Sequence, residues 1–204
     1  IPNGISFNEK MPLEDIKERY GIQEDKYILF VARLVPEKGC HYLIEAFKNI
    51  STDMKLIIAG DNPYNMEYVN SLKEMASSDS RIKMIGFQDM KVLSSLYSNT
   101  YAYVLPSDIE GLPISLLEAM SFGCLCIVSD IEENLVVLEE NGLCFKKGDI
   151  DSLKSVLEDV IINNYKYTEN FDSDILSKRV RYDYNWDEVA SKTEKSYKKV
   201  LEKH

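Results

Sequence analysis

The chain has 204 residues, of which 45% are hydrophobic and 28% charged, so it is long and apolar enough for one sizeable globular domain and is not a disordered chain. Its formal charge of −10 argues against a surface for nucleic acid, and no apolar run approaches the roughly 20 residues that a membrane helix needs. Four scattered cysteines are too few for a disulfide framework and favour reduced thiols, as in a cytoplasmic protein.

Short apolar runs alternate with amphipathic stretches along most of the chain. The runs are mostly apolar throughout, which is typical of strands buried on both faces of a parallel sheet. The sequence therefore predicts an α/β fold, an open parallel sheet of about six strands with helices on both faces. The expected strands are 27–32, 55–59, 82–85, 102–105, 125–128 and 143–145, and the expected helices between them lie around 42–50, 93–97, 116–120 and 153–161.

The alternation of runs stops at about residue 165. Two helical stretches follow near 174–181 and 187–203, and we expect them to pack outside the sheet or to run back toward whatever precedes Ile1. Tyr182 and Trp186 are interpreted as packing anchors for this tail. The opening residues include no initiator Met and no signal peptide, which we interpret as a piece cut from a longer protein.

Two basic residues lie in the loop after the first expected strand, which reads "ARLVPEKG". Ligands of open parallel sheets lie beyond the carboxyl ends of the strands, so Arg33 and Lys38 could converge on one anion such as a phosphate. In the alternative interpretation they pair with Glu37 or with solvent, where exposed ion pairs contribute only ~0–1 kcal/mol. This loop by itself leaves both interpretations open.

The segment "EGLPISLLE" carries two acids eight positions apart. Gly111 lets a ligand approach the backbone, Pro113 suits the first helical turn, and the free amides of a helix start attract anions. Glu110 can complement the helix dipole. Glu118 lies within an apolar run, so it must face solvent or a cleft, or accept hydrogen bonds from donors such as ribose hydroxyls. A diphosphate between this helix start and the basic loop is the resulting hypothesis.

Several segments resemble one known family. They are "IPNG", "ARLVPEKG", "LIIAGDNP", "MIGFQ", "PSDIEGLPISLLEAMSFG" and "YNWDEVASKTEKSYKKVL". Together they resemble the C-terminal domain of family 4 retaining glycosyltransferases of GT-B architecture, over nearly the whole chain. The resemblance implies one donor-binding domain over 1–204, with a Rossmann-like core at about 1–165 and a helical tail at 166–204. It also implies that the N-terminal acceptor domain is absent from this chain.

The resemblance implies a role for each matched residue. Arg33 and Lys38 correspond to the pair that neutralises the donor diphosphate, Glu110 to the acid that contacts the sugar hydroxyls, and Glu118 to the acid that holds the ribose. Arg33, Lys38 and Glu110 thus form the implied catalytic set. The remaining implied donor-binding residues are Gly111, Leu112, Pro113 and Ile114 near the sugar and phosphates, and Phe87 and Gln88 near the base.

The implied activity is transfer of a hexose-type sugar, with retention of configuration, from a UDP- or GDP-sugar to a glycan or lipid-linked acceptor. The basic pair and the helix amides would stabilise the departing diphosphate, and no metal or other cofactor is implied. The acceptor would bind through the missing domain, so we expect this chain alone to be inactive. The implied location is the cytoplasm, with peripheral attachment to the inner face of the membrane as an alternative for the full-length protein.

Some features depart from the family pattern or compete with it. The turn reads Glu-Gly-Leu-Pro instead of Glu-Gly-Phe-Gly. The loop "SDIEEN" lacks the glycines often found after the fifth strand, and this second departure puts ligand contacts from Glu133 or Asn134 in doubt. The acids of 172–174 resemble a metal-binding pair of another architecture, but we expect a helix cap there, and a structural role for His41. The alternative functions are a GT-B epimerase and a non-catalytic nucleotide-sugar sensor.

Overall fold

Six parallel strands form one sheet in the order β3-β2-β1-β4-β5-β6. The structure is a computed structural model that describes residues 3–169 and 171–201, so Ile1 and Pro2 of the N-terminal motif lie outside the described residues. The strands are β1 (Tyr27–Val31), β2 (Lys55–Ala59), β3 (Ile82–Gly86), β4 (Ala102–Leu105), β5 (Leu125–Ser129) and β6 (Leu143–Phe145). The six predicted runs are therefore confirmed, with ends that differ by one residue in β1, β3 and β5.

Helices connect successive strands and continue beyond the last one. They are α1 (Glu14–Tyr20), η1 (Pro36–Lys38), α2 (Cys40–Lys48), α3 (Met66–Ser77), α4 (Met90–Asn99), α5 (Ile114–Ser121), α6 (Glu132–Leu138), α7 (Ile150–Ile162), η2 (Tyr165–Tyr167), α8 (Ser173–Asp183) and α9 (Trp186–Leu201). Residues 202 and 203, the end of the last predicted helix, lie outside the described residues. No helix within 3–169 or 171–201 has both the length and the apolar character of a membrane span.

Both faces of the sheet are buried, as the continuous apolar runs predict. Tyr27, Leu29 and Val31 of β1 face one core, and the intervening Ile28 and Phe30 face the other. The first core is covered by α1, α4, α5, α6 and α8, and the second by α2, α3 and α7. The side chains alternate because successive residues of a strand point to opposite faces. The predicted fold class, a parallel α/β sheet with helices on both faces, is confirmed.

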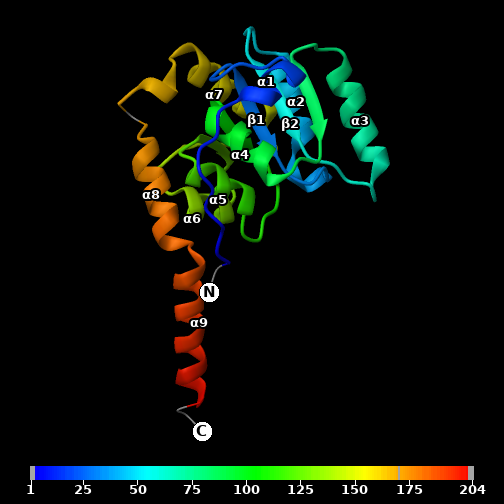
Figure 1. Ribbon diagram of the computed structural model, residues 1–204. Coiled ribbons are helices and arrows are strands. Elements are labelled where there is room, and N and C mark those ends of the chain that lie inside the picture. Colours follow the sequence, from blue (N-terminus) through cyan, green and yellow to red (C-terminus); the bar gives the residue numbers. More distant parts are fainter. Residues whose placement is uncertain (1–2, 170, 202–204) are drawn as a thin grey trace.

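The C-terminal helices leave the sheet in two steps. Helix α8 packs on α5, and α9 then extends away from the body of the domain, with the N-terminal end beside the junction between them (Figure 1). The amide of Ile5 donates to the carbonyl of Tyr184 at 2.9 Å, which ties the N-terminal segment to the junction between α8 and α9. Trp186 lies against Gly4, so it contacts the N-terminal segment although it is 53% exposed, whereas Tyr182 is 75% exposed. The interpretation of Tyr182 as a packing anchor is wrong.

Strands β1 and β4 are neighbours although they are not consecutive in sequence, which creates a switch point in the sheet. The loops that follow them are in tight contact. The amide of Asp108 donates to the carbonyl of Glu37 at 2.8 Å, and a Cβ at Gly39 would lie only 2.0 Å from the carbonyl oxygen of Pro106. Since ligands of such sheets bind at switch points, this is where a site is expected.

Candidate functional site

Lys38, the last residue of η1, forms an ion pair across the switch point. Its Nζ lies 2.7 Å from Oε1 of Glu110, and the two side chains are 21% and 6% exposed. The hydroxyl of Ser107 donates to the same oxygen at 2.7 Å. Lys38 is therefore paired with Glu110, and not with Glu37 or with solvent alone. Two residues of the predicted site, Lys38 and Glu110, thus meet above the carboxyl edge of the sheet.

Arg33 follows β1, is exposed and forms no ion pair with any residue that the structure describes. It lines a cavity of about 400 Å³ at the carboxyl ends of β1 and β2. Phe87 and Gln88, from the loop after β3, line the same cavity, as does Ser115 from the first turn of α5. The structure therefore brings three predicted donor-binding residues from two different loops to one hollow.

The cavity combines an apolar wall with few polar groups. Phe87 is 81% exposed, so its ring is available to a flat ligand. The side-chain amide of Gln88 donates to the carbonyl of Ile85 at 2.5 Å, and its oxygen accepts from the hydroxyl of Tyr20 at 3.5 Å. These bonds hold Gln88 in place at the edge of the cavity. Such a hollow, largely apolar with a few fixed polar groups, is typical of small-molecule sites.

Helix α5 begins shortly after Glu110 in the sequence, and its first turn borders the cavity. Pro113 is its N-cap, with φ −75° and ψ 81°, and not its first helical residue as predicted, because this ψ lies outside the helical range. The amides of Leu116 and Leu117 donate to the Pro113 carbonyl, whereas those of Ile114 and Ser115 have no acceptor within the described ranges. The helix start therefore presents two free N–H groups, the arrangement that binds anions.

The turn before the helix is open to solvent. Gly111 is exposed, and a Cβ added to it would meet nothing within 4 Å. Ile114 is 37% exposed, and Leu112 packs partly against the core. The backbone is therefore accessible at Gly111, whereas Leu112 has a structural contact and Pro113 is buried.

Glu118 lies one turn further along α5, half-buried, and does not line the cavity. The hydroxyl of Tyr97 donates to its Oε2 at 3.2 Å. Burial raises the pKa of Glu118 above its ordinary value, and the hydrogen bond from Tyr97 opposes that rise. An acid in an apolar run was expected to face solvent, to face a cleft or to accept hydrogen bonds. Glu118 meets the third expectation, because it accepts from Tyr97.

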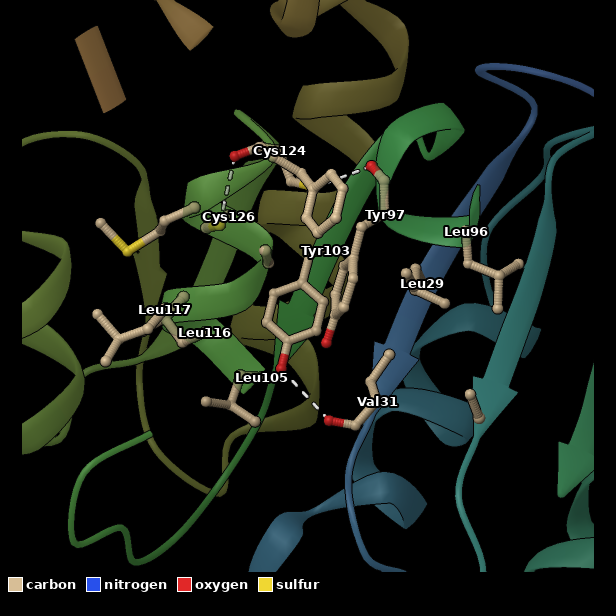
Figure 2. Packing of buried hydrophobic residues seen from close by; sticks show 14 of the residues in the cluster. Leu29, Val31, Leu96, Tyr97, Tyr103, Leu105, Leu116, Leu117, Cys124 and Cys126 are labelled. Atoms are coloured by element: carbon tan, nitrogen blue, oxygen red, sulfur yellow. Dashed lines mark hydrogen bonds between the residues drawn. The ribbon is translucent and has the colours of Figure 1, made fainter. Parts of the chain in front are cut away.

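Two buried tyrosines fix the inner side of α5, a feature that sequence reasoning missed. The rings of Tyr97 and Tyr103 lie side by side between this helix and the strands (Figure 2). The hydroxyl of Tyr103 is 2.8 Å from Oγ of Ser115 and 3.4 Å from the carbonyl of Val31. The tyrosines themselves were the available signal, because a tyrosine that is fully buried needs a hydrogen-bond partner for its hydroxyl. Which residue becomes the partner, however, depends on the strand order.

The other sequence predictions concern structural roles. Asp172 caps α8 by accepting from the amides of Asp174 and Ile175 at 2.9 and 3.0 Å, so the predicted cap is confirmed. His41 lies in the first turn of α2, with Nδ1 2.8 Å from the hydroxyl of Tyr68, and burial lowers its pKa. Asn134 is fully buried. In the described part of the chain, no group of three or more His, Cys, Asp or Glu could hold a metal ion.

Comparison with known proteins decides the family. Residues 13–175 match the family described as glycosyl transferases group 1. The chain belongs to this family. An uncharacterized glycosyltransferase of Methanocaldococcus jannaschii is 30% identical over 97% of this chain and 50% of its own length. The UDP-Gal:alpha-D-GlcNAc-diphosphoundecaprenol alpha-1,3-galactosyltransferase of Escherichia coli is 33% identical over 80% of this chain and 46% of its own length. This glycosyl transferase chain therefore spans about half the length of the curated relatives it matches.

Solved structures agree on the fold of this group 1 glycosyl transferase. The Anabaena protein HepE, in complex with UDP and glucose, superimposes with a TM-score of 0.81 at 17% identity over 92% of this chain and 52% of that chain. Sucrose-phosphate synthase of Thermosynechococcus elongatus gives 0.83 at 21% identity over 100% of this chain and 53% of that chain. The predicted C-terminal domain of a GT-B fold is confirmed. The roles of the individual site residues in binding a donor stay predictions.

Proposed function

We propose that this chain is the donor-binding domain of a retaining glycosyltransferase that transfers a hexose-type sugar from a nucleoside-diphosphate sugar to a glycan or lipid-linked acceptor. One observation supports it most strongly. The first turn of α5 presents free amides from Ile114 and Ser115. Ser115 also lines the cavity that contains Arg33, and Glu110, paired with Lys38, lies just before this turn in the sequence. A diphosphate flanked by a sugar and a nucleoside has the same three-part layout.

In this proposal each part of the donor has its own partners. The base lies in the cavity beside Phe87 and Gln88, and the ribose hydroxyls donate to Glu118. The diphosphate lies against the α5 amides and the guanidinium of Arg33. The sugar lies over Gly111, where its hydroxyls donate to Glu110.

The chemistry required of these residues is electrostatic. When the bond between the sugar and the diphosphate breaks, negative charge develops on the departing oxygen. The helix amides are held in place by the fold before the reaction, and Arg33 and Lys38 close on the diphosphate when it binds. Preorganised donors such as these amides lower such barriers by several kcal/mol, roughly 2.7–4 for a single one. This positive charge is supplied by the chain itself, so we propose that transfer needs no metal cofactor. The acceptor binds through a further domain.

A UDP-sugar is the first donor to test, since the Escherichia coli relative is named for UDP-Gal and HepE was solved with UDP. We propose a cytoplasmic location, consistent with four cysteines that are all free, of which Cys40, Cys124 and Cys126 are buried. In this proposal the lipid-linked alternative for the acceptor would bring the full-length protein to the inner face of the membrane.

The test is a thermal-shift panel of UDP-, GDP- and ADP-sugars on the full-length protein, followed by assay of sugar release and transfer with the donor that stabilises it most. We expect one nucleotide class to raise the melting temperature and that donor to be turned over in the presence of an acceptor. Stabilisation without any turnover would favour the sensor, and interconversion of the free sugar nucleotide would favour the epimerase. No stabilisation by any nucleotide sugar would contradict the proposal.

A further inference from the structure

Ser107 is a buried residue that connects the core of the sheet to Glu110. It follows β4, is fully buried, and donates from Oγ to Oε1 of Glu110 at 2.7 Å. Lys38 approaches the same oxygen at 2.7 Å. No residue in the described ranges donates to Oε2 of Glu110. The carboxylate is therefore held by two donors on one oxygen, and its second oxygen is left for another partner.

Ser107 is itself held from behind by a buried polar chain. The hydroxyl of Ser129, the last residue of β5, donates to the carbonyl of Ser107. The side-chain amide of Asn134, in α6, donates to the carbonyl of Ser129 at 3.2 Å and to its Oγ at 3.0 Å. Ser107, Ser129 and Asn134 are all 0% exposed. Hydrogen bonds in such a dry environment are strong and fix geometry, because water does not compete for the groups.

We propose that Ser107 is a positioning residue for Glu110, a role that rests on the proposed function. A lysine side chain is flexible and follows a bound phosphate, so Lys38 alone cannot fix the carboxylate when the ligand arrives. The backbone carbonyl of Ser107 is anchored to the sheet through Ser129 and Asn134, so the hydroxyl of the same residue keeps Oε1 of Glu110 in place and leaves Oε2 for the ligand. Glu110 is then oriented to accept from a hydroxyl of the donor sugar, and Ser107 acts on the sugar part of the donor without touching it.

The distinction between a sugar and a nucleotide contact gives the test. Wild type, Ser107→Ala, Glu110→Gln and the double variant are titrated by calorimetry with UDP and with UDP-galactose, or with GDP and GDP-mannose if the uridine ligands give no heat. Ser95→Ala is the matched control. Its buried hydroxyl also donates to a carbonyl, that of Pro12, but it lies away from Glu110.

We expect Ser107→Ala to weaken the sugar nucleotide about tenfold, as for loss of one hydrogen bond to a charged group, and to leave the affinity for the free nucleotide unchanged. In the Glu110→Gln background, Ser107→Ala should have no further effect, and Ser95→Ala should change neither affinity. A non-additive pair of this kind shows that one residue acts through the other. If Ser107→Ala is insoluble, Ser129→Ala should give a smaller loss with the same selectivity.

Other outcomes separate this inference from the proposed function. Equal weakening of free nucleotide and sugar nucleotide would overturn the inference, since Ser107 would then only maintain the loop. An unchanged affinity for the sugar nucleotide in Ser107→Ala, with a loss in Glu110→Gln, would also overturn it and leave the proposed function intact. Absence of binding by wild type to all four ligands would contradict the proposed function, and the inference with it.

Discussion

The ammonium of Lys38 lies 2.7 Å from Oε1 of Glu110, although the two residues belong to loops that follow β1 and β4. The pair joins these loops at the switch point of the sheet, where the Glu110 side chain is only 6% exposed. The same ion pair therefore holds the two loops together and sets the geometry of the proposed donor site. A change to either residue is expected to affect both the stability of the domain and the binding of the donor.

Removing one partner of this pair should destabilise the domain. Lys38→Met leaves the carboxylate of Glu110 shielded from water without its cation, which we expect to lower the free energy of unfolding by about 1–3 kcal/mol. The double variant Lys38→Met/Glu110→Gln removes the unpaired charge and should recover most of that loss, although neither variant should bind a sugar nucleotide as wild type does. Urea unfolding measures both effects. A single variant as stable as wild type would show that the pair contributes nothing.

Of two glycines near the site, only Gly39 should lose stability when it is replaced by alanine. Gly39 has φ +67°, and an added Cβ would lie 2.0 Å from the Pro106 carbonyl oxygen, so Gly39→Ala must push the two loops apart. We expect a loss of more than about 1 kcal/mol of stability. Gly111→Ala is the matched control, since a Cβ there meets nothing within 4 Å. It should leave the unfolding midpoint unchanged and weaken only the sugar nucleotide, and a large loss of stability in Gly111→Ala would contradict this account.

Arg33 should matter for binding and not for folding. Its side chain is exposed and has no acidic partner among the residues described, so Arg33→Ala should change the free energy of unfolding by less than about 0.5 kcal/mol. Loss of a charged hydrogen bond to the diphosphate should weaken the nucleoside diphosphate about tenfold or more. Arg181→Ala, which removes an exposed arginine from α8, controls for the change in net charge. Equal affinities in the two variants would remove Arg33 from the site.

The raised pKa of Glu118 predicts a pH dependence of stability. Because burial raises the pKa of this acid in the folded state above its ordinary value of 4.5, the folded protein holds the proton more tightly than the unfolded chain does. The contribution of Glu118 to stability is thus fully present below that ordinary value and is lost as the pH rises through the folded pKa. Glu118→Gln should therefore be more stable than wild type at neutral pH and equal to it near pH 4. Denaturant unfolding across this range tests the sign, and a less stable variant at neutral pH would contradict it.

The sheet could be predicted well from the sequence, because a strand that is buried on both faces consists almost entirely of apolar residues. Each strand of the sheet centre, such as Lys55–Ala59, is an almost uninterrupted apolar run. Helix α3 (Met66–Ser77) was not among the expected helices, because its buried residues are only Val69, Leu72 and Ala76. Tyr182 was misjudged for a geometric reason. It lies two residues, or about 200° of helical rotation, after the buried Val180, so it faces away from the core.

The site could be predicted only in part from the sequence. Arg33, Phe87 and Gln88 follow parallel strands, so their meeting at one edge follows from the fold class. The Lys38–Glu110 pair forms because β1 and β4 are neighbours in the sheet. The strand order cannot be predicted from the local pattern of apolar residues, so the sequence did not predict this pair. Ser107 and Tyr97 act through hydrogen bonds to acids that the sequence did identify, but their partners are set by side-chain packing.

A crystal structure of this chain with UDP, or with GDP if calorimetry selects it, tests the proposed donor site directly. We predict phosphate oxygens within hydrogen-bond distance of the Ile114 and Ser115 amides and of the Arg33 guanidinium, with the ribose at Glu118. A nucleotide bound elsewhere, for example in the groove beside Met11 and Val92, or with its phosphates away from the start of α5, would contradict this prediction.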